Sequence, residues 1–211
     1  MRNITVILFF ITLCISKNLV IAQNSSQSSS KQEFANLKVY KSSMNYYGFR
    51  DSVTDNLVID MKYRYAENFE DGLAKVGVGT TNSASTCAPK LYGYIDSGGR
   101  EVIPCKYHSA WGFSEGIGVL QLDSTFFFFD KTGKELFHLS NYDHITKFEG
   151  GIARIREKNG GYGFIDKTGK LIIPCIYDWE YDYSNGLIEM KLNGKSVFFD
   201  TKGQKITKKQ K

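Results

Sequence analysis

The sequence predicts an all-β protein: a tandem array of short antiparallel hairpins or three-stranded units that stack into an elongated body. Three observations lead to this fold class. Five aromatic-rich runs each end in Asp, and they are Tyr47–Asp51, Tyr92–Asp96, Phe126–Asp130, Tyr162–Asp166 and Ser196–Asp200. These Asp residues recur at intervals of 45, 34, 36 and 34 residues, which is typical of stacked supersecondary units. Most of these Asp residues are followed by residues typical of a turn. Runs in which apolar and polar residues alternate come next, as expected for strands.

The N-terminal residues have the pattern of an export signal. Arg2 gives a weakly positive start, the run 4–16 is apolar but too short to span a bilayer, and Ala22 offers a small residue for cleavage. An uncleaved N-terminal anchor is the alternative. The expected divisions of the chain are a signal peptide at 1–22, a flexible Ser/Gln-rich spacer at 23–36, β repeats at 37–206 and a basic tail at 207–211.

Several classes of function are disfavoured by composition. No later stretch is long enough for a transmembrane helix, so we expect an exported protein that is periplasmic, on the cell surface or secreted, with no membrane span after cleavage. The 27 basic and 22 acidic residues are too nearly balanced to indicate a nucleic-acid partner. Cys87, Cys105 and Cys175 remain after cleavage, an odd number. We expect Cys105 and Cys175 to be buried and unbridged, and Cys87 to be the more reactive thiol.

The clearest repeat runs from Tyr162 to Leu192. Its first strand ends at Asp166, a turn closes at Gly169, and a returning strand stops at Pro174. A connection leads to a third strand, which begins after Gly186. Because the same Asp and Gly recur in register, we assign turn chemistry to these structural anchors: Asp96, Asp130, Asp166, Asp200, Gly99, Gly133, Gly169 and Gly203.

The second half of each unit repeats an aromatic anchor, Tyr63, Tyr107, Tyr142 or Tyr177, and a later Gly. The third strands that follow alternate apolar and polar residues, which predicts one face on the core and one face in water. This alternation places Arg154, Arg156 and Lys191 on an outward, weakly basic stripe. The last unit stops after one hairpin, as a capping repeat does.

The combined pattern resembles the WG-repeat family. The motif is aromatic-Gly-Phe/Tyr-Ile-Asp-x-x-Gly-Lys, then Ile-Pro-x-x-Tyr, then Phe-x-x-Gly-Leu-Ala, and the resemblance extends from about Tyr46 to Ile206. Tyr replaces the family's Trp before Gly48, Gly93 and Gly163. The resemblance implies an all-β repeat array, often exported, with no shared active site. A small closed propeller is the alternative architecture, although three strands per unit is fewer than a blade normally has.

No catalytic or metal-binding constellation is evident in the sequence, and no cofactor is expected. The recurring Asp residues occur singly, without the clustered oxygens of a calcium loop. His108, His138 and His144 lie in different units, and no nucleophile-elbow motif accompanies them. We therefore expect a non-enzymatic protein.

Binding residues are expected in the connections between the anchor Tyr and the next strand, which vary in sequence. The candidate ligand-binding residues are Tyr65, Trp111, Trp179, Tyr181, Arg154 and Arg156. Aromatic rings there could bind a sugar or a protein, or they could fill gaps between units. The predicted function is an exported, non-catalytic binding or scaffold module for a protein or glycan at the cell envelope. The alternative is an exported hydrolase of envelope polysaccharide or peptide, which would need two carboxylates at one cleft.

Overall fold

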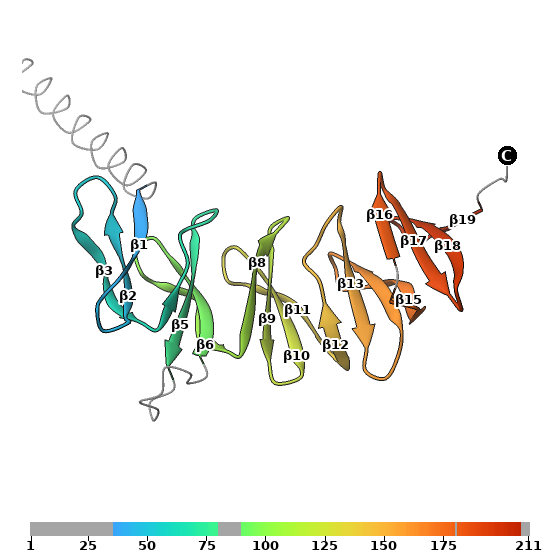
Figure 1. Cartoon of the computed structure of the whole chain (residues 1–211), viewed down its shortest axis with the longest axis horizontal. Coiled ribbons are helices and arrows are strands. Elements are labelled where there is room, and N and C mark those ends of the chain that lie inside the picture. Colours follow the sequence, from blue (N-terminus) through green and yellow to red (C-terminus); the bar gives the residue numbers. More distant parts are fainter. Residues whose placement is uncertain (1–35, 80–89, 180, 208–211) are drawn as a thin grey trace, which may run out of the picture.

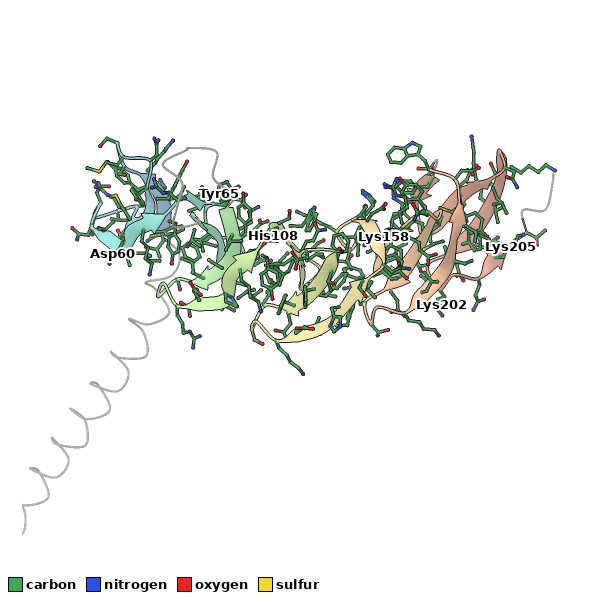
Figure 2. The ribbon with its side chains drawn as sticks, turned by 90° about the horizontal axis from the view of Figure 1, so that it is seen from below. Asp60, Tyr65, His108, Lys158, Lys202 and Lys205 are labelled. Atoms are coloured by element: carbon green, nitrogen blue, oxygen red, sulfur yellow. The ribbon has the colours of Figure 1, made fainter. Side chains whose placement is uncertain are left out.

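The computed structural model describes residues 36–79, 90–179 and 181–207, and these residues form a row of five antiparallel sheets without any helix. The sheets follow one another along the longest axis in chain order and do not close into a ring (Figure 1). Asp60 lies near one end of the row and Lys205 near the other (Figure 2). The predicted all-β repeat stack is confirmed, and the described chain is an open array.

Each sheet is formed by strands that are consecutive in sequence. The first sheet contains β1 (Leu37–Lys41), β2 (Tyr47–Asp51) and β3 (Leu57–Tyr63). The second contains β4 (Tyr65–Ala66), β5 (Leu73–Gly79), β6 (Lys90–Asp96) and β7 (Glu101–Tyr107). The third contains β8 (Ser109–Ser114), β9 (Ile117–Leu122), β10 (Thr125–Asp130) and β11 (Glu135–Ser140). The fourth contains β12 (Tyr142–Ile145), β13 (Ile152–Glu157), β14 (Tyr162–Asp166) and β15 (Leu171–Tyr177). The fifth contains β16 (Tyr181–Ser184), β17 (Leu187–Leu192), β18 (Lys195–Asp200) and β19 (Lys205–Ile206).

Four of the five described sheets have one strand more than the three expected per unit, because the segments expected to be connections form edge strands. β4, β8, β12 and β16 come from these segments and complete four-stranded sheets. The sheets are also out of phase with the sequence repeat. The third strand of the Tyr162 unit, β17, pairs with β16 and β18 of the next sheet instead of with its own hairpin. The terminal hairpin thereby completes the fifth sheet, and the incomplete sheet is the first one.

Four hydrophobic clusters lie between the five sheets, one between each neighbouring pair. The cluster between the third and fourth sheets contains Phe128, Ile145 and Ile155, and the one between the fourth and fifth contains Ile173, Ile188 and Met190. The other two clusters join the first sheet to the second and the second to the third. No sheet has a core of its own, so stacking buries the apolar side chains, as a solenoid-like array requires.

The inner sheets are consequently buried on both faces. The expectation that one face of each third strand lies in water was wrong. Residues Ile152 to Ile155 of β13 are all buried. Ala153 and Ile155 pack toward the third sheet, whereas Ile152 packs toward the fifth. Period-two alternation identifies two faces of a strand but does not reveal that a second sheet covers the other face.

The Gly of each Tyr-Gly pair lets two strands approach closely. A Cβ on Gly163 would come within 2.4 Å of the Ile173 carbonyl oxygen, and Gly48 and Gly93 have equivalent contacts. At each of these pairs the strand register shifts by a bulge. In β10, Phe127 occupies the position of this Gly, and the strand register does not shift at Phe127. Phe126 pairs with Leu139, so Leu139 and not Tyr142 occupies the position of the anchor Tyr in the third sheet.

The recurring Asp residues organise the hairpin turns. The Asp166 carboxylate accepts hydrogen bonds from the backbone N–H groups of Thr168 (2.8 Å) and Lys170 (3.1 Å), and Asp96, Asp130 and Asp200 do the same at their turns. Gly169 adopts a φ of 82°, which a side chain would disfavour. This geometry leaves the carboxylates engaged with their own turns.

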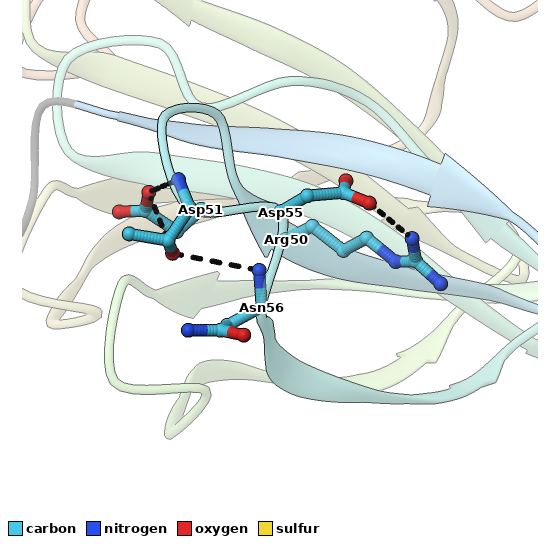
Figure 3. Close-up of polar contacts among 5 residues, drawn as sticks. Arg50, Asp51, Asp55 and Asn56 are labelled. Carbon is cyan, nitrogen blue, oxygen red and sulfur yellow. Dashed lines mark hydrogen bonds and ion pairs between the residues drawn. The ribbon is translucent and has the colours of Figure 1, made fainter.

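The first turn differs because one residue is inserted. The Asp51 carboxylate accepts hydrogen bonds from the N–H groups of Val53 and Thr54, and Asp55 adopts the positive φ. The backbone N–H of Asp51 donates to the Asn56 carbonyl. Asp55 forms a 2.8 Å ion pair with Arg50 (Figure 3). The turn therefore closes without a Gly.

The two cysteines in the described part of the chain are free. Cys175 is buried in the cluster between the third and fourth sheets. Cys105 is only half-buried, contrary to expectation, and burial raises the pKa of its thiol to about 12. Cys87, the expected signal peptide (1–22), the spacer up to residue 35 and the tail from residue 208 lie outside the described residues. Residues 36–79, 90–179 and 181–207 contain no helix that could cross a membrane.

Candidate functional site

A groove between the fourth and fifth sheets is the candidate binding site. It contains a cavity of about 560 Å³. The lining residues are Ser114, Thr146, Lys147, Phe148, Glu149, Ile152, Arg154, Phe164 and 181–183. This volume lies within the range of small-molecule pockets, about 300–1,000 Å³. The edge strand β16 and the central strand β13 provide its two walls.

A second depression continues from the first around β16. It has a volume of about 430 Å³, and Trp179, Tyr181, Asp182, Glu189 and Lys191 line it. Tyr181 and Asp182 belong to both hollows, so the two form one continuous surface. Trp179 is 64% exposed and Tyr181 is 43% exposed. Exposed aromatic rings that gather beside a hollow are candidates for contact with a ligand or partner.

Arg154 lies at the centre of the groove and is only 6% exposed. Its guanidinium carbon lies 4.0 Å from the ring centre of Tyr181, 5.0 Å from that of Tyr162 and 5.1 Å from that of Trp179. These distances are suitable for cation–π attraction. The sequence-based placement of Arg154 on an outward basic stripe was therefore wrong, because the fifth sheet covers this face of β13.

The Arg154 guanidinium is under-satisfied. Its Nε and Nη1 atoms are buried, and neither has a hydrogen-bond partner among the described residues. Its Nη2 atom lies 3.5 Å from Nε2 of His144, and no ion pair joins it to a carboxylate in the described part of the chain. Buried charges are ordinarily paired, so an unpaired guanidinium facing a cavity is the most unusual electrostatic feature here.

Arg156, two residues further along β13, is fully engaged. Its Nε and Nη2 donate to the two carboxylate oxygens of Asp143 at 2.6 and 2.8 Å. This hydrogen-bonded pair lowers the pKa of Asp143 and raises the pKa of Arg156. Burial, followed by the two neighbouring arginines, lowers the pKa of His144, so this ring remains neutral near pH 7. Arg156 therefore stabilises the edge strand β12 beside the groove.

The remaining predicted binding residues lie elsewhere. Trp111 is half-buried on β8, 5.8 Å from the Phe126 ring, and packs against the cluster between the third and fourth sheets. Tyr65 is half-buried on β4, where its hydroxyl donates to Glu67 and its ring lies 5.5 Å from that of Tyr92. The structure thus brings Trp179, Tyr181 and Arg154 together and separates them from Trp111 and Tyr65.

The groove also contains residues that the sequence reading did not single out. Lys147, Glu149, Asp182 and Glu189 contribute charge at its walls. Asp182 lies in a predicted connection, so attention to charged as well as aromatic residues there could have identified it. Glu189 lies on a β strand between the buried Ile188 and Met190, and nothing local in the sequence shows that it borders a hollow.

In the described part of the chain, the histidines and acidic residues do not come together as a catalytic or metal-binding site. His108 and Lys158 lie at separate places along the stack (Figure 2), and His138 is bonded to Glu135 at 2.9 Å. Asp143 pairs with Arg156 and not with His144. Among the residues for which the structure gives positions, no group of three or more His, Cys, Asp or Glu could hold a metal ion.

The comparison with protein families identifies repeats across most of the array. The family described as "WG containing repeat" matches residues 47–79, 92–125, 126–161 and 162–195. The matched units begin at the aromatic runs, so each one straddles two of the observed sheets. No curated protein matches the sequence.

Solved structures with similar folds are distant in sequence. The computationally designed Ika8 protein is 16% identical with a TM-score of 0.43, and the match covers 82% of this chain and 58% of that one. BamB from Moraxella catarrhalis is 12% identical with a TM-score of 0.40, covering 78% and 55%. A eukaryotic initiation factor is 9% identical with a TM-score of 0.49, covering 83% and 52%. The chain thus spans between about half and three-fifths of the length of these structures.

Proposed function

The chain belongs to the family of WG-containing repeats, and we propose that it is an exported, non-catalytic binding module of the cell envelope. The groove between the fourth and fifth sheets binds the ligand, a glycan or a protein segment. The apolar N-terminal run followed by small residues supports export. The array itself serves as the scaffold that holds the two sheets at a constant distance.

The observation that carries this proposal is the exposure of Trp179 and Tyr181 over a hollow. Both rings are fixed at one edge by Arg154, and both keep a large exposed area. Rigid aromatic rings supply contact area at a small cost in conformational entropy. Charged groups on either side, including Lys147 and Asp182, offer hydrogen bonds that orient a ligand.

Binding to envelope material provides the test. The wild-type protein and the double variant Trp179→Ala/Tyr181→Ala are immobilised, exposed to envelope extracts and to a glycan array, and compared by retained ligand. We expect the double variant to lose the retained species. Tyr40→Ala is the matched control, because Tyr40 is also a partly exposed ring but lies on the first sheet. Equal retention by all three proteins would refute the assignment of the groove.

Export is tested separately by cell fractionation. A tagged chain is expected in the envelope or the medium, with a new N-terminus at Gln23. Retention in the cytoplasm with an intact N-terminus would contradict this part of the proposal while leaving the groove untouched.

Hydrolysis of a bound polymer is the alternative, because Glu149 and Asp182 both line the cavity. Two carboxylates at one cleft can serve as acid and base in glycoside hydrolysis. Incubation of each retained glycan with wild type, Glu149→Gln and Asp182→Asn separates the two functions. Product release by wild type that either variant abolishes would establish an enzyme. Stable retention of intact glycan supports a binding module.

A further inference from the structure

We propose that the groove selects a carboxylated sugar, whose carboxylate pairs with the guanidinium of Arg154 while a sugar ring stacks on Trp179. This inference rests on the proposed binding function and deepens it by naming the chemical class of the ligand. It follows from three features of the groove: an unpaired buried cation, exposed aromatic rings beside it, and the size of the two hollows.

The unpaired cation defines the charge of the ligand. Arg154 has two buried donors without a partner among the residues that the structure describes, and it lines the larger hollow. A guanidinium presents a planar fork of N–H donors that matches a carboxylate in two parallel hydrogen bonds. Cation–π contacts with Tyr162, Trp179 and Tyr181 compensate part of its lost hydration but satisfy none of these donors. Nε and Nη1 lie on different edges of the guanidinium, so one ligand carboxylate would supply the missing charge and would accept hydrogen bonds from one of these donors together with Nη2.

Access to these donors depends on Tyr181. Its ring lies 4.0 Å from the guanidinium and covers it on the side of the fifth sheet. Tyr181 is the first residue of the edge strand β16, and its side chain is 43% exposed. Rotation of this side chain toward solvent opens the guanidinium to the hollow. It gives up one ring contact with the cluster beneath, that with Phe164 at 6.1 Å between ring centres, whereas Ile188 and Met190 belong to the neighbouring strand β17.

The size and polarity of the groove favour a glycan over a protein surface. The two hollows, about 560 and 430 Å³, are each in the range of a compact ligand. Stable protein interfaces instead bury broad surfaces with an apolar centre. Here the exposed rings are flanked by Asp182, Glu189 and Lys191, which can bond to sugar hydroxyls. Glu189 already accepts a 2.5 Å hydrogen bond from Ser196, which orients its carboxylate.

The acidic groups also restrict where the ligand charge can lie. Glu149, Asp182 and Glu189 would repel a ligand that carries charge along its whole length. Arg154 and Lys147 line the inner hollow and balance Glu149 and Asp182 there, whereas the outer hollow has Asp182 and Glu189 against the single cation Lys191. The carboxylated residue of the ligand therefore lies in the inner hollow, and its uncharged neighbour stacks in the outer one.

Matched sugar pairs test this inference with the full-length protein. The probes are three oligosaccharides that each carry a single acidic residue, galacturonate, glucuronate or N-acetylmuramate, each paired with its methyl ester. Equilibrium binding is measured for wild type, Arg154→Met, Arg154→Lys and Trp179→Ala. Arg100→Met is the control, because Arg100 is an exposed arginine at a distant turn.

The expected result is that wild type binds at least one acid about ten-fold more tightly than its ester, the factor that corresponds to one net charge-assisted contact. Arg154→Met binds the acid and the ester equally, Arg154→Lys keeps part of the preference, and Arg100→Met behaves as wild type. Trp179→Ala weakens both forms. Because replacing a buried ion by an apolar residue often preserves stability, Arg154→Met is expected to fold.

A second measurement does not depend on folding of a variant. In wild type, the Arg154 Nε–H resonance is expected to shift when the acid is added and to remain unchanged with the ester. Binding of acids and esters with equal affinity would overturn the inference while leaving the proposed function intact. Binding of an acidic peptide but of no sugar would overturn it in favour of a protein ligand. Failure of every probe would also overturn it, and the envelope extracts would then decide the function.

Discussion

Gly169 in the turn of the fourth sheet lies directly against the ring of Phe137 in the third sheet. A Cβ at Gly169 would come within 2.6 Å of this ring, and the residue also has a φ of 82°. Gly133 and Gly203 meet backbone atoms of the preceding sheets in the same way. The turn Gly therefore has two structural roles: it closes the hairpin, and it permits close contact with the preceding sheet.

The first prediction separates the stability cost of the backbone conformation from that of the contact with the preceding sheet. Gly186 has a φ of 75° but no neighbour within 4 Å, so Gly186→Ala should cost about 1 kcal/mol for the backbone conformation alone. Gly169→Ala should lower the free energy of unfolding by about 1–3 kcal/mol more, because the added atom overpacks the interface. Urea unfolding of the two variants measures the difference. Equal losses would show that the contact with Phe137 adjusts without cost.

The second prediction concerns the two tryptophans. Trp111 packs against Phe126 at an interface between sheets, and Trp111→Ala should lower the free energy of unfolding by about 2–4 kcal/mol. Trp179 is 64% exposed, so Trp179→Ala should cost less than about 1 kcal/mol. Thermal unfolding followed by circular dichroism distinguishes them. A larger loss for Trp179→Ala would mean that its ring stabilises the stack and would weaken its assignment to ligand binding.

The third prediction is a pH effect at a turn. The hydroxyl of Thr132, followed by the N–H groups of the turn, bonds to Asp130 and holds the pKa of this carboxyl below its usual value. A carboxyl whose folded pKa is depressed contributes stability above its unfolded pKa and loses it as the pH falls through the folded pKa. Thr132→Val should therefore raise the pKa of Asp130, measured by NMR titration, and move this acid-induced loss of stability to higher pH.

Lys131→Met is the control for this experiment. Lys131 belongs to the same turn, but its Nζ pairs with Asp71 at 2.7 Å and not with Asp130. The pKa of Asp130 should stay the same in this variant. A rise as large as that in Thr132→Val would mean that general charge, and not the hydroxyl hydrogen bond, sets the value.

The fourth prediction tests whether the sheets unfold one by one. Met190 is fully buried between the fourth and fifth sheets, and Met190→Ala should cost about 2–5 kcal/mol. Because the fifth sheet is the last of the described row and packs on the fourth, the loss should open this terminal sheet first. Hydrogen exchange should accelerate in β16–β19 and remain slow in β8–β11. Uniform acceleration along the chain would indicate one cooperative unit.

Much of the fold was predictable because it depends on local chemistry. The Asp and Gly of each turn act within a few residues, through bonds such as those from Thr168 and Lys170 to Asp166. The edge strands were missed because segments such as Tyr181–Ser184 are short and polar, and they become strands only by pairing with a neighbour. The same reason explains the shift between sequence repeats and sheets.

The binding groove was predictable only in part. The sequence predicted Trp179 and Tyr181 as binding residues because they are aromatic and lie in a variable segment. Trp111 meets the same criterion but packs between two sheets. Nothing local distinguishes them, because the number of neighbouring sheets determines the exposure of a ring. Trp179 follows the strand that ends the fourth sheet and remains outside the stack.

By itself, the sequence determined the repeat, the strand-forming runs and the hairpin turns, since each depends on backbone preferences and hydrogen bonds within a few residues. Only the tertiary structure decided which strands share a sheet, which faces are buried and where Arg154 lies. These outcomes depend on pairing and stacking between neighbouring units, beyond the few residues over which backbone preferences act. Such contacts bury a polar residue on a face that alternation alone would assign to water.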